Sequence, residues 1–129
     1  MGELTFAKGL AEEAGKTIVE MFRQARAWTK AGDQWVTEAD IKAEKIIIDS
    51  IKEKYPDHGI VSEEAGRPRQ GEEYWIVDPL DGTHNFHFGI PFFGVCIGLV
   101  DRKGPRMAVV FDPNRNDMFH AERGGGAFR

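Results

Sequence analysis

The sequence predicts an α+β domain in which two long helices pack on a largely antiparallel sheet. Two observations carry this prediction. Apolar residues recur at three- and four-residue steps through most of the first 54 residues, as they do in amphipathic helices. From residue 58 onward, short β-prone runs alternate with turn-forming residues instead. A length of 129 residues suits a single domain, spanning residues 1–129, with a core of its own.

The first helix is predicted over residues 3–28, where apolar residues from Ala7 to Ile18 and beyond fall on one face. Residues 30–34 break this period and contain a glycine, so they predict a loop. A short extended piece is expected to follow at residues 35–36.

The second helix is predicted to begin after Thr37, a suitable capping residue, and to run to about Lys54. Acidic residues in its first turn, Asp40 among them, favour the positive end of a helix. Pro56 follows, and the residue before a proline is pushed out of the helical region. The buried stripe is expected to consist of Ile41, Ile47, Ile48 and Ile51, and the solvent side of Lys42, Glu44, Lys45, Lys52 and Glu53.

The second half of the chain is predicted to be a run of strands joined by short turns. Residues 74–77 are entirely apolar and predict a strand covered on both faces. This strand should lie parallel to the one at residues 58–62 if Glu63 and Asp78, which follow the two strands, are to meet at one edge. The other expected elements are a loop over residues 65–72, a short helix over 82–86, strands over 92–100, 107–111 and 117–122, and turns at 101–104 and 112–116.

Composition and charge argue against several classes of function. Hydrophobic residues make up 41% and charged residues 29% of the chain, which are values of a globular protein. The net charge of -4, without a dense run of Lys or Arg, argues against nucleic acid as a partner. No apolar run approaches the roughly 20 residues that cross a membrane. The one cysteine, Cys96, excludes an internal disulfide, and its place in an apolar run predicts a buried thiol instead of a reactive one. We therefore expect a cytoplasmic protein that does not bind membranes.

An acidic, turn-forming cluster follows the second predicted strand. Asp78 and Asp81 stand three positions apart, and Gly82 and Thr83 come directly after them. Carboxylates at a strand end can present oxygen ligands to a hard cation, although Asp-Pro and Asp-Gly are also common turn dipeptides. A hydroxyl and the backbone amides of a helix start would suit an anion beside that cation. The cluster is therefore a candidate site for a phosphate ester.

Other acidic residues stand at predicted element boundaries, namely Asp40, Glu63 and Glu64. Carboxylates gathered at one edge repel one another unless a cation neutralises them, and without nitrogen or sulfur ligands magnesium, manganese or calcium is preferred over zinc. His84 and His87 have helical spacing, but two histidines without a partner motif form a weak metal site. For Asp40 and Glu64 taken singly, a helix start and a solvated charge are the simpler interpretations.

Residues 75–86, WIVDPLDGTHNF, resemble the signature of the inositol monophosphatase family of magnesium-dependent, lithium-sensitive sugar-phosphate phosphatases. Further similar blocks occur in the family's order and spacing, so that the resemblance covers essentially the whole chain. These blocks are VTEAD (36–40), IKEKYP (51–56), VSEE (61–64), PFFGVCIG (91–98) and GGGAF (124–128). The implied fold is the N-terminal domain shared by inositol monophosphatases and fructose-1,6-bisphosphatases.

The resemblance implies a ligand set for two magnesium ions. Glu63, Asp78 and the backbone carbonyl of Leu80 would hold the first ion. Asp78 would also bridge to a second ion, held by Asp81. The resemblance thus assigns Mg²⁺ as the cofactor.

The resemblance also implies the remaining catalytic roles. Glu63 and Thr83 would position and activate the attacking water, and Asp40 would orient the hydroxyl of Thr83. The backbone amides of Gly82 and Thr83 would bind the phosphate. The implied activity is hydrolysis of inositol monophosphate, or a similar small-molecule phosphate monoester, by a homodimer.

Three departures limit what the resemblance implies. Family members continue beyond the GGGAF block into a second α/β domain, which supplies another aspartate to the second metal and contacts the substrate. This chain resembles the N-terminal half only, so we expect it to bind one magnesium weakly and to turn over slowly by itself. His84 replaces a common Thr, and Ser62 replaces a usual Gly, which alters the approach to Glu63.

Several alternatives therefore stay open. The substrate of the parent enzyme could instead be fructose 1,6-bisphosphate or 3′-phosphoadenosine 5′-phosphate. The Asn85-Phe86 end of the signature favours inositol phosphate over the latter. A different class of function, a non-catalytic metal-binding or interaction domain, is the second hypothesis for the chain as it stands.

Overall fold

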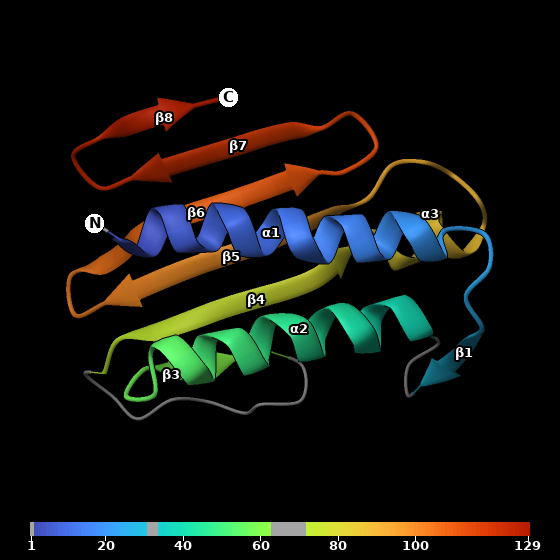
Figure 1. Cartoon of the computed structure of the whole chain (residues 1–129), viewed down its shortest axis with the longest axis horizontal. Helices are drawn as coiled ribbons and strands as arrows, with labels where there is room; N and C mark the ends of the chain where they lie inside the picture. The colour runs from blue at the N-terminus through green and yellow to red at the C-terminus, as the bar shows by residue number, and fades with distance from the viewer. Residues whose placement is uncertain (1, 31–33, 63–71) are drawn as a thin grey trace.

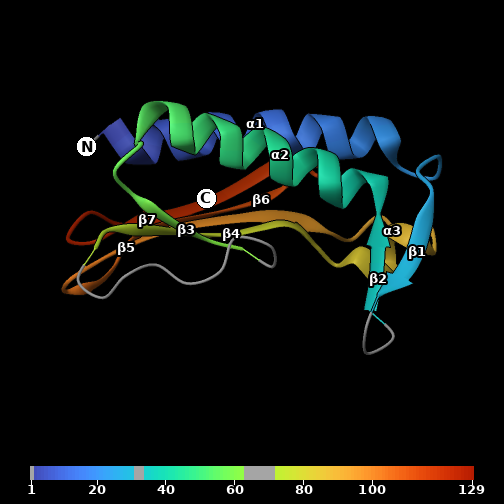
Figure 2. The ribbon, with the colours of Figure 1, turned by 90° about the horizontal axis from the view of Figure 1, so that it is seen from below.

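The computed structural model describes residues 2–30, 34–62 and 72–129 and has two layers, a helix pair and a sheet (Figure 1). Helices α1 (Gly2–Met21) and α2 (Glu38–Lys54) lie on one face of the sheet (Figure 2). The strands are β1 (Ala27–Lys30), β2 (Gln34–Thr37), β3 (Gly59–Val61), β4 (Tyr74–Asp81), β5 (Gly94–Asp101), β6 (Gly104–Asp112), β7 (Asp117–Glu122) and β8 (Gly126–Phe128), and α3 is Thr83–His87. The predicted α+β class is confirmed.

In the part of the chain that the structure describes, the sheet has six strands in sequence order, β3-β4-β5-β6-β7-β8. Among these described strands only β3 and β4 pair in parallel, as predicted, with Val61 opposite Ile76. All other neighbours are antiparallel. A separate two-stranded hairpin of β1 and β2 lies at one end of the molecule beside α3 (Figure 2). The hairpin therefore lies at the end of the fold where β4 runs into α3.

Helix α1 is shorter than predicted, because it ends at Met21 instead of continuing to residue 28. Arg23 adopts a left-handed φ of 68°, a conformation that an α-helix does not continue through. Trp28 lies in a strand and pairs with Val36. The apolar period misled the prediction because Ala25, beyond the helix, still packs on the core.

Helix α2 begins and ends where the sequence predicts. The hydroxyl of Thr37 accepts hydrogen bonds from the amides of Ala39 and Asp40, and the carboxylate of Asp40 accepts one from the amide of Thr37. This reciprocal pair is a capping box, which satisfies backbone donors that a helix start leaves unpaired. It fixes Asp40 in one orientation.

The buried stripe of α2 is only half as predicted. Ile47 and Ile51 are fully buried, but Ile48 is half-buried and Ile41 is 49% exposed. The residues that face the sheet stand four apart, so Ala43 precedes Ile47 on the same face. Ile41 lies two positions from Ala43 and therefore points away from the sheet.

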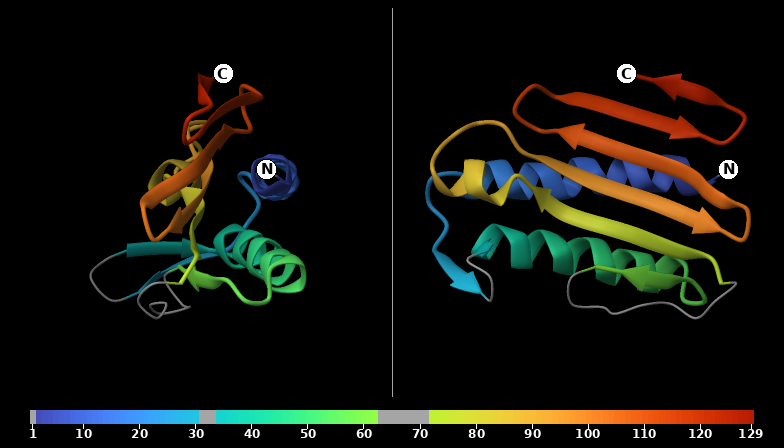
Figure 3. Two further views of the ribbon diagram at one scale, coloured as in Figure 1. Left: turned by 90° about the vertical axis from the view of Figure 1, so that its left-hand side faces the viewer. Right: turned by 180° about the vertical axis from the view of Figure 1, so that it is seen from behind.

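Strand β4 is covered on one face only, so the prediction of two covered faces is wrong. Trp75 and Val77 are buried, whereas Ile76 between them is 47% exposed. Both long helices lie on the same side of the sheet. Viewed from the opposite side, the strands lie in front of the helices (Figure 3, right). An apolar run can therefore be a strand with one open face.

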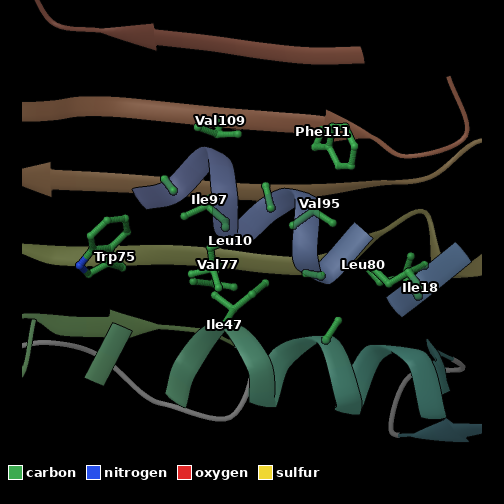
Figure 4. Packing of buried hydrophobic residues seen from close by; sticks show 14 of the residues in the cluster. Leu10, Ile18, Ile47, Trp75, Val77, Leu80, Val95, Ile97, Val109 and Phe111 are labelled. Carbon is green, nitrogen blue, oxygen red and sulfur yellow. The ribbon is translucent and has the colours of Figure 1, made fainter. Parts of the chain in front are cut away.

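The core lies between the helix pair and the sheet (Figure 4). Leu10 and Ile18 come from α1 and Ile47 from α2, and they meet Val77 of β4 and Val95 of β5. These side chains are at most 5% exposed. The core fixes how α2 packs against β4. It therefore sets the positions of the residues that follow β4. Neither long helix combines the length and hydropathy that crossing a membrane requires, within the described ranges.

The remaining strands and turns are close to their predicted positions. The turns between β5, β6 and β7 are confirmed, and β7 has the predicted bounds. Strand β5 begins at Gly94, not at Phe92, which is 65% exposed. Strand β8 was not predicted, because its glycine-rich sequence carries no strand signal. Of the two predicted loops, residues 31–33 and 65–71 lie outside the described residues, and Lys30 and Gln34 are strand residues.

Candidate functional site

The acidic cluster lies at the C-terminal end of β4, where a pocket of about 800 Å³ opens. Its wall comes from β2, α2, the end of β3, β4 and the start of α3. The predicted site residues that line it are Asp40, Asp78, Leu80, Asp81, Gly82 and Thr83. Glu63 and Glu64 lie outside the described residues. The structure thus brings together in one pocket all predicted site residues that it describes.

A shift in strand register presents both aspartates of β4 to solvent. The pairing of β4 with β5 changes register between Asp78 and Asp81, and Pro79 between them has no amide for the ladder. In a regular strand, residues three apart point to opposite faces. Here both aspartates are exposed, while Leu80 between them is 3% exposed and belongs to the core.

Gly82 turns the chain from β4 into α3 with a left-handed φ of 95°. A Cβ at this position would lie 3.0 Å from the carbonyl oxygen of Phe92 and 3.2 Å from Cβ of Phe93. Glycine fits both the conformation and the space, which a larger residue does not. The turn lets α3 begin at Thr83, so that Asp81 and Thr83 line the same pocket.

A hydrogen-bond network connects this turn to the start of α2. The hydroxyl of Thr83 lies 2.8 Å from Oδ1 of Asp40, which is 43 residues away in the sequence. The other carboxylate oxygen of Asp40, Oδ2, accepts from the amide of Thr37 at 2.8 Å and from its hydroxyl at 2.7 Å. Thr37 itself is 1% exposed. The carboxylate of Asp40 is therefore held by three donors.

The hydroxyl proton of Thr83 has two acceptors within reach. These are Oδ1 of Asp40 at 2.8 Å and the carbonyl oxygen of Leu80 at 3.1 Å. One hydroxyl carries one proton, and a charged acceptor at the shorter distance makes the stronger bond. With the proton directed to Asp40, the lone pairs of Thr83 remain acceptors for another molecule.

The family model that matches this chain is that of the inositol monophosphatase family, over residues 2–129. The chain belongs to this family. It is 40% identical over 129 residues to a histidinol-phosphatase of Chlorobaculum parvum, covering 98% of the chain and 50% of that relative. It is also 40% identical over 129 residues to the Nus factor SuhB of Vibrio cholerae, covering 96% of the chain and 48% of that relative.

Solved structures of the inositol monophosphatase family have the same fold. An IMPase of Thermotoga maritima matches with a TM-score of 0.91 and 35% identity, covering 99% of this chain and 51% of that one. The chain therefore spans about half the length of the relatives that it matches.

The donors at the end of β4 fit the magnesium ion that the family resemblance implies. Asp78, Asp81 and the carbonyl of Leu80 offer oxygen atoms only, the ligands that Mg²⁺ prefers. Within the described ranges, no three His, Cys, Asp or Glu side chains form a group that could hold a metal. The remaining carboxylate implied by the resemblance, Glu63, lies outside those ranges. The described donors therefore fit magnesium in kind, and would supply part of the ligand set that the resemblance implies.

The two histidines of α3 contact aromatic rings. The ring of His87 stacks on Trp35 of β2, with centroids 4.0 Å apart. His84 is exposed, lines the pocket, and stacks on Phe88 at 5.8 Å. Trp35 also lines the pocket, so Trp35 and His84 bring two aromatic rings to the pocket of the aspartates. No local pattern in the sequence predicts this arrangement, since β2 ends 41 residues before Asp78 of β4.

Cys96 of β5 lies directly opposite Asp78 of β4 and is half-buried. Burial, together with the negative charges of Asp81 and Asp78, raises the pKa of its thiol to about 11. The thiol therefore stays protonated near neutral pH. The prediction of a buried thiol is thus met only in part, because Cys96 is half-buried.

Glu44 was predicted on the solvent side of α2, and this prediction is wrong. Its side chain is half-buried and lines the same pocket as Asp40. The available signal was its position one helical turn after Asp40, because residues four apart share a helix face. Ser62, at the end of β3, lines the pocket as well.

Proposed function

We propose that the protein is a magnesium-dependent phosphomonoesterase that hydrolyses inositol monophosphate, or a similar sugar or polyol phosphate, with water. The observation that carries this proposal is the 2.8 Å contact from Thr83 to Asp40, in a pocket that also contains Asp78 and Asp81. A held hydroxyl beside oxygen ligands for a cation suits a reaction of water with a phosphate ester. The name of the Chlorobaculum parvum relative, histidinol-phosphatase, supports the same chemistry.

Magnesium would be held by Asp78, Asp81, the carbonyl of Leu80 and, on the family resemblance, Glu63. When bound, it would offset the negative charge of the phosphate and lower the pKa of the attacking water. The aspartates alone would repel a phosphate dianion. The proposed activity therefore requires the metal, and inhibition by lithium is part of the same proposal.

The chain's own residues would orient the reactants. Because Thr83 donates its proton to Asp40, its oxygen can accept a hydrogen bond from water and hold one water lone pair toward phosphorus. The backbone amides of Gly82 and Thr83 would bind phosphate oxygens, on the side away from the water. Phosphoryl transfer needs such in-line positioning more than it needs covalent chemistry from the protein.

Phosphate release from inositol 1-phosphate tests the proposal, with Mg²⁺ and with a chelator. The assay uses both the protein as its gene encodes it and the 129-residue chain. We expect release to require Mg²⁺, and Thr83→Val to lower kcat about 100-fold, within the range for a lost proton-handling group. Thr29→Val on exposed β1 is the matched control and should leave kcat unchanged. Full turnover in the Thr83→Val variant would refute the assigned role.

Metal binding is tested separately by calorimetry. Asp78→Asn should weaken Mg²⁺ binding, because it replaces a charged oxygen ligand with a neutral amide. A variant that binds Mg²⁺ as tightly as the unchanged protein would remove Asp78 from the site. Comparing inositol 1-phosphate with histidinol phosphate, fructose 1,6-bisphosphate and 3′-phosphoadenosine 5′-phosphate then identifies the preferred substrate.

A second candidate function is that of a non-catalytic metal-binding or interaction domain. The Vibrio cholerae relative, called a Nus factor, favours this candidate. Magnesium binding without phosphate release from any of the four esters would support it over the enzyme. The proposal for the enzyme further includes a homodimer in the cytoplasm, and sedimentation of the protein as its gene encodes it tests the dimer.

A further inference from the structure

Two residues at the pocket each have a buried polar atom without a hydrogen-bond partner among the described residues. The atoms are Oε1 of Glu44 on α2 and Oγ of Ser62 directly after β3, and each has less than 1 Å² of solvent-accessible surface. Both residues line the pocket that contains Asp40 and Asp78. Buried polar atoms in proteins are nearly always hydrogen-bonded, so each unpaired one needs a physical reason.

The two atoms are complementary in chemistry. A carboxylate oxygen only accepts hydrogen bonds, while a serine hydroxyl has a proton to donate. Each atom that stays unpaired costs the free energy of removing it from water. One hydrogen bond between the two atoms would offset both penalties. A rotation of the Ser62 side chain, or one bridging water, suffices to close the pair.

The backbone places the two residues on elements that border the same pocket. Val61 is the register partner of Ile76, which lies exposed on the face of the sheet that is away from the helices. Side chains alternate along a strand, so Ser62 points to the opposite face, where α2 lies. Glu44 follows Asp40 by one helical turn and lies on the pocket side of α2.

We propose that Glu44 is a positioning residue that holds the end of β3 against α2 by accepting a hydrogen bond from Ser62. Ser62 is the residue directly before Glu63, which the family resemblance assigns to the metal, so this bond would fix the position from which the chain continues to Glu63. The inference deepens the proposed function and rests on it for its catalytic consequence. Glu44 acts through Ser62 and does not itself touch the substrate.

Substitution at the two positions separates hydrogen bonding from charge. Glu44→Ala and Ser62→Ala should each raise the Kd for Mg²⁺, measured by calorimetry, about 2- to 10-fold, the worth of one hydrogen bond. Glu44→Gln keeps an acceptor oxygen and should bind Mg²⁺ within twofold of the unchanged protein. The double variant Glu44→Ala/Ser62→Ala should have a Kd for Mg²⁺ no higher than that of either single variant, because both substitutions remove the same hydrogen bond. The Mg²⁺ concentration for half-maximal phosphate release should shift in parallel, with kcat at saturating Mg²⁺ changed less.

The matched control is Asp49→Ala on the solvent side of the same helix. Asp49 pairs with Lys45 at 2.8 Å and is 60% exposed, so its loss changes the charge of α2 without changing the pocket. Magnesium binding should not respond to it. If Glu44→Gln weakens Mg²⁺ binding as much as Glu44→Ala, Glu44 acts through its charge and the proposal fails. Additive losses in the double variant also overturn it.

The calorimetric test keeps the two proposals distinguishable. If the unchanged protein binds Mg²⁺ but releases no phosphate, the proposed function fails while the coupling of Glu44 and Ser62 is still measured. If phosphate is released and the two positions are uncoupled, only the present inference fails. Urea unfolding of all variants identifies any that lose the fold. It also gives a second measure of the pair, because the two single substitutions and the double one should lower the free energy of unfolding non-additively.

Discussion

Replacing Asp40 by asparagine should separate the stability of the fold from the proposed chemistry. Oδ2 of Asp40 accepts two hydrogen bonds from Thr37, and Oδ1 accepts one from Thr83. The amide oxygen of asparagine can take the place of Oδ2 and keep the capping box. Its amide nitrogen then faces Thr83 and donates, so that the hydroxyl of Thr83 turns its proton to the carbonyl of Leu80, 3.1 Å away.

The expected loss of stability is small for this substitution. Asp40→Asn removes charge from hydrogen bonds that it mostly keeps, at a cost of about 1 kcal/mol in the free energy of unfolding. Asp40→Ala removes every acceptor and leaves the amide of Thr37 unpaired at the helix start, at about 2–3 kcal/mol. Urea unfolding followed by tryptophan fluorescence measures both, since Trp75 is fully buried in the fold.

The expected loss of activity is large. In the Asp40→Asn variant Thr83 accepts from the amide and is less able to accept from water, so kcat should fall about 100-fold. Asp49→Asn, at an exposed pair on the same helix, should change stability by less than about 0.5 kcal/mol and leave kcat unchanged. An Asp40→Asn protein as active as the unchanged one would refute the assigned direction of the Thr83 hydrogen bond.

Three further predictions concern the scaffold. Gly82→Ala should lower the free energy of unfolding by about 1–3 kcal/mol because of its φ of 95° and the 3.0 Å approach to a carbonyl, whereas Gly9→Ala, with nothing within 4 Å, should raise it by about 0.5–1 kcal/mol. Ile47→Ala should cost about 2–5 kcal/mol and Ile41→Ala less than about 1 kcal/mol, since Ile47 is fully buried and Ile41 is 49% exposed. Equal effects in either pair would contradict the burial argument. With its pKa raised from 9.0 to about 11, Cys96 should react with iodoacetamide at pH 8 about 100-fold more slowly than in urea. A folded-state rate equal to that in urea would contradict the shift. Because the thiol loses its proton at a lower pH in the unfolded chain than in the fold, the free energy of unfolding should be unaffected by the ionisation of Cys96 below pH 9. It should fall as the pH rises from 9 toward 11.

The helices show how far a sequence pattern reaches. The period of apolar residues predicted both long helices, and Thr37 and Pro56 predicted the bounds of α2. The same period continued α1 past Met21, because apolar residues beyond the helix pack on the same core. Periodicity reports burial, and burial does not require that the backbone stay helical.

The one-sided burial of β4 had no signal in the sequence. An apolar run of four residues is compatible with a strand covered on one face or on both, and only the placement of α1 and α2 on the same face decides between them. Likewise, residue 41 and residue 47 of α2 are both isoleucine, and only the direction in which the helix meets the sheet buries one and exposes the other.

The sequence by itself determined the residue types of the site, because oxygen ligands, a left-handed glycine and a hydroxyl in the order Asp78, Asp81, Gly82, Thr83 are local features of the chain. It also determined the family, through blocks that keep their order and spacing. The resemblance also implied that Asp40 orients the hydroxyl of Thr83, but only the tertiary structure decided the geometry of this contact across 43 residues, and that Glu44 lines the pocket instead of the solvent side. Such contacts depend on how α2 packs across β4, and that packing is fixed by the whole core and not by any local stretch.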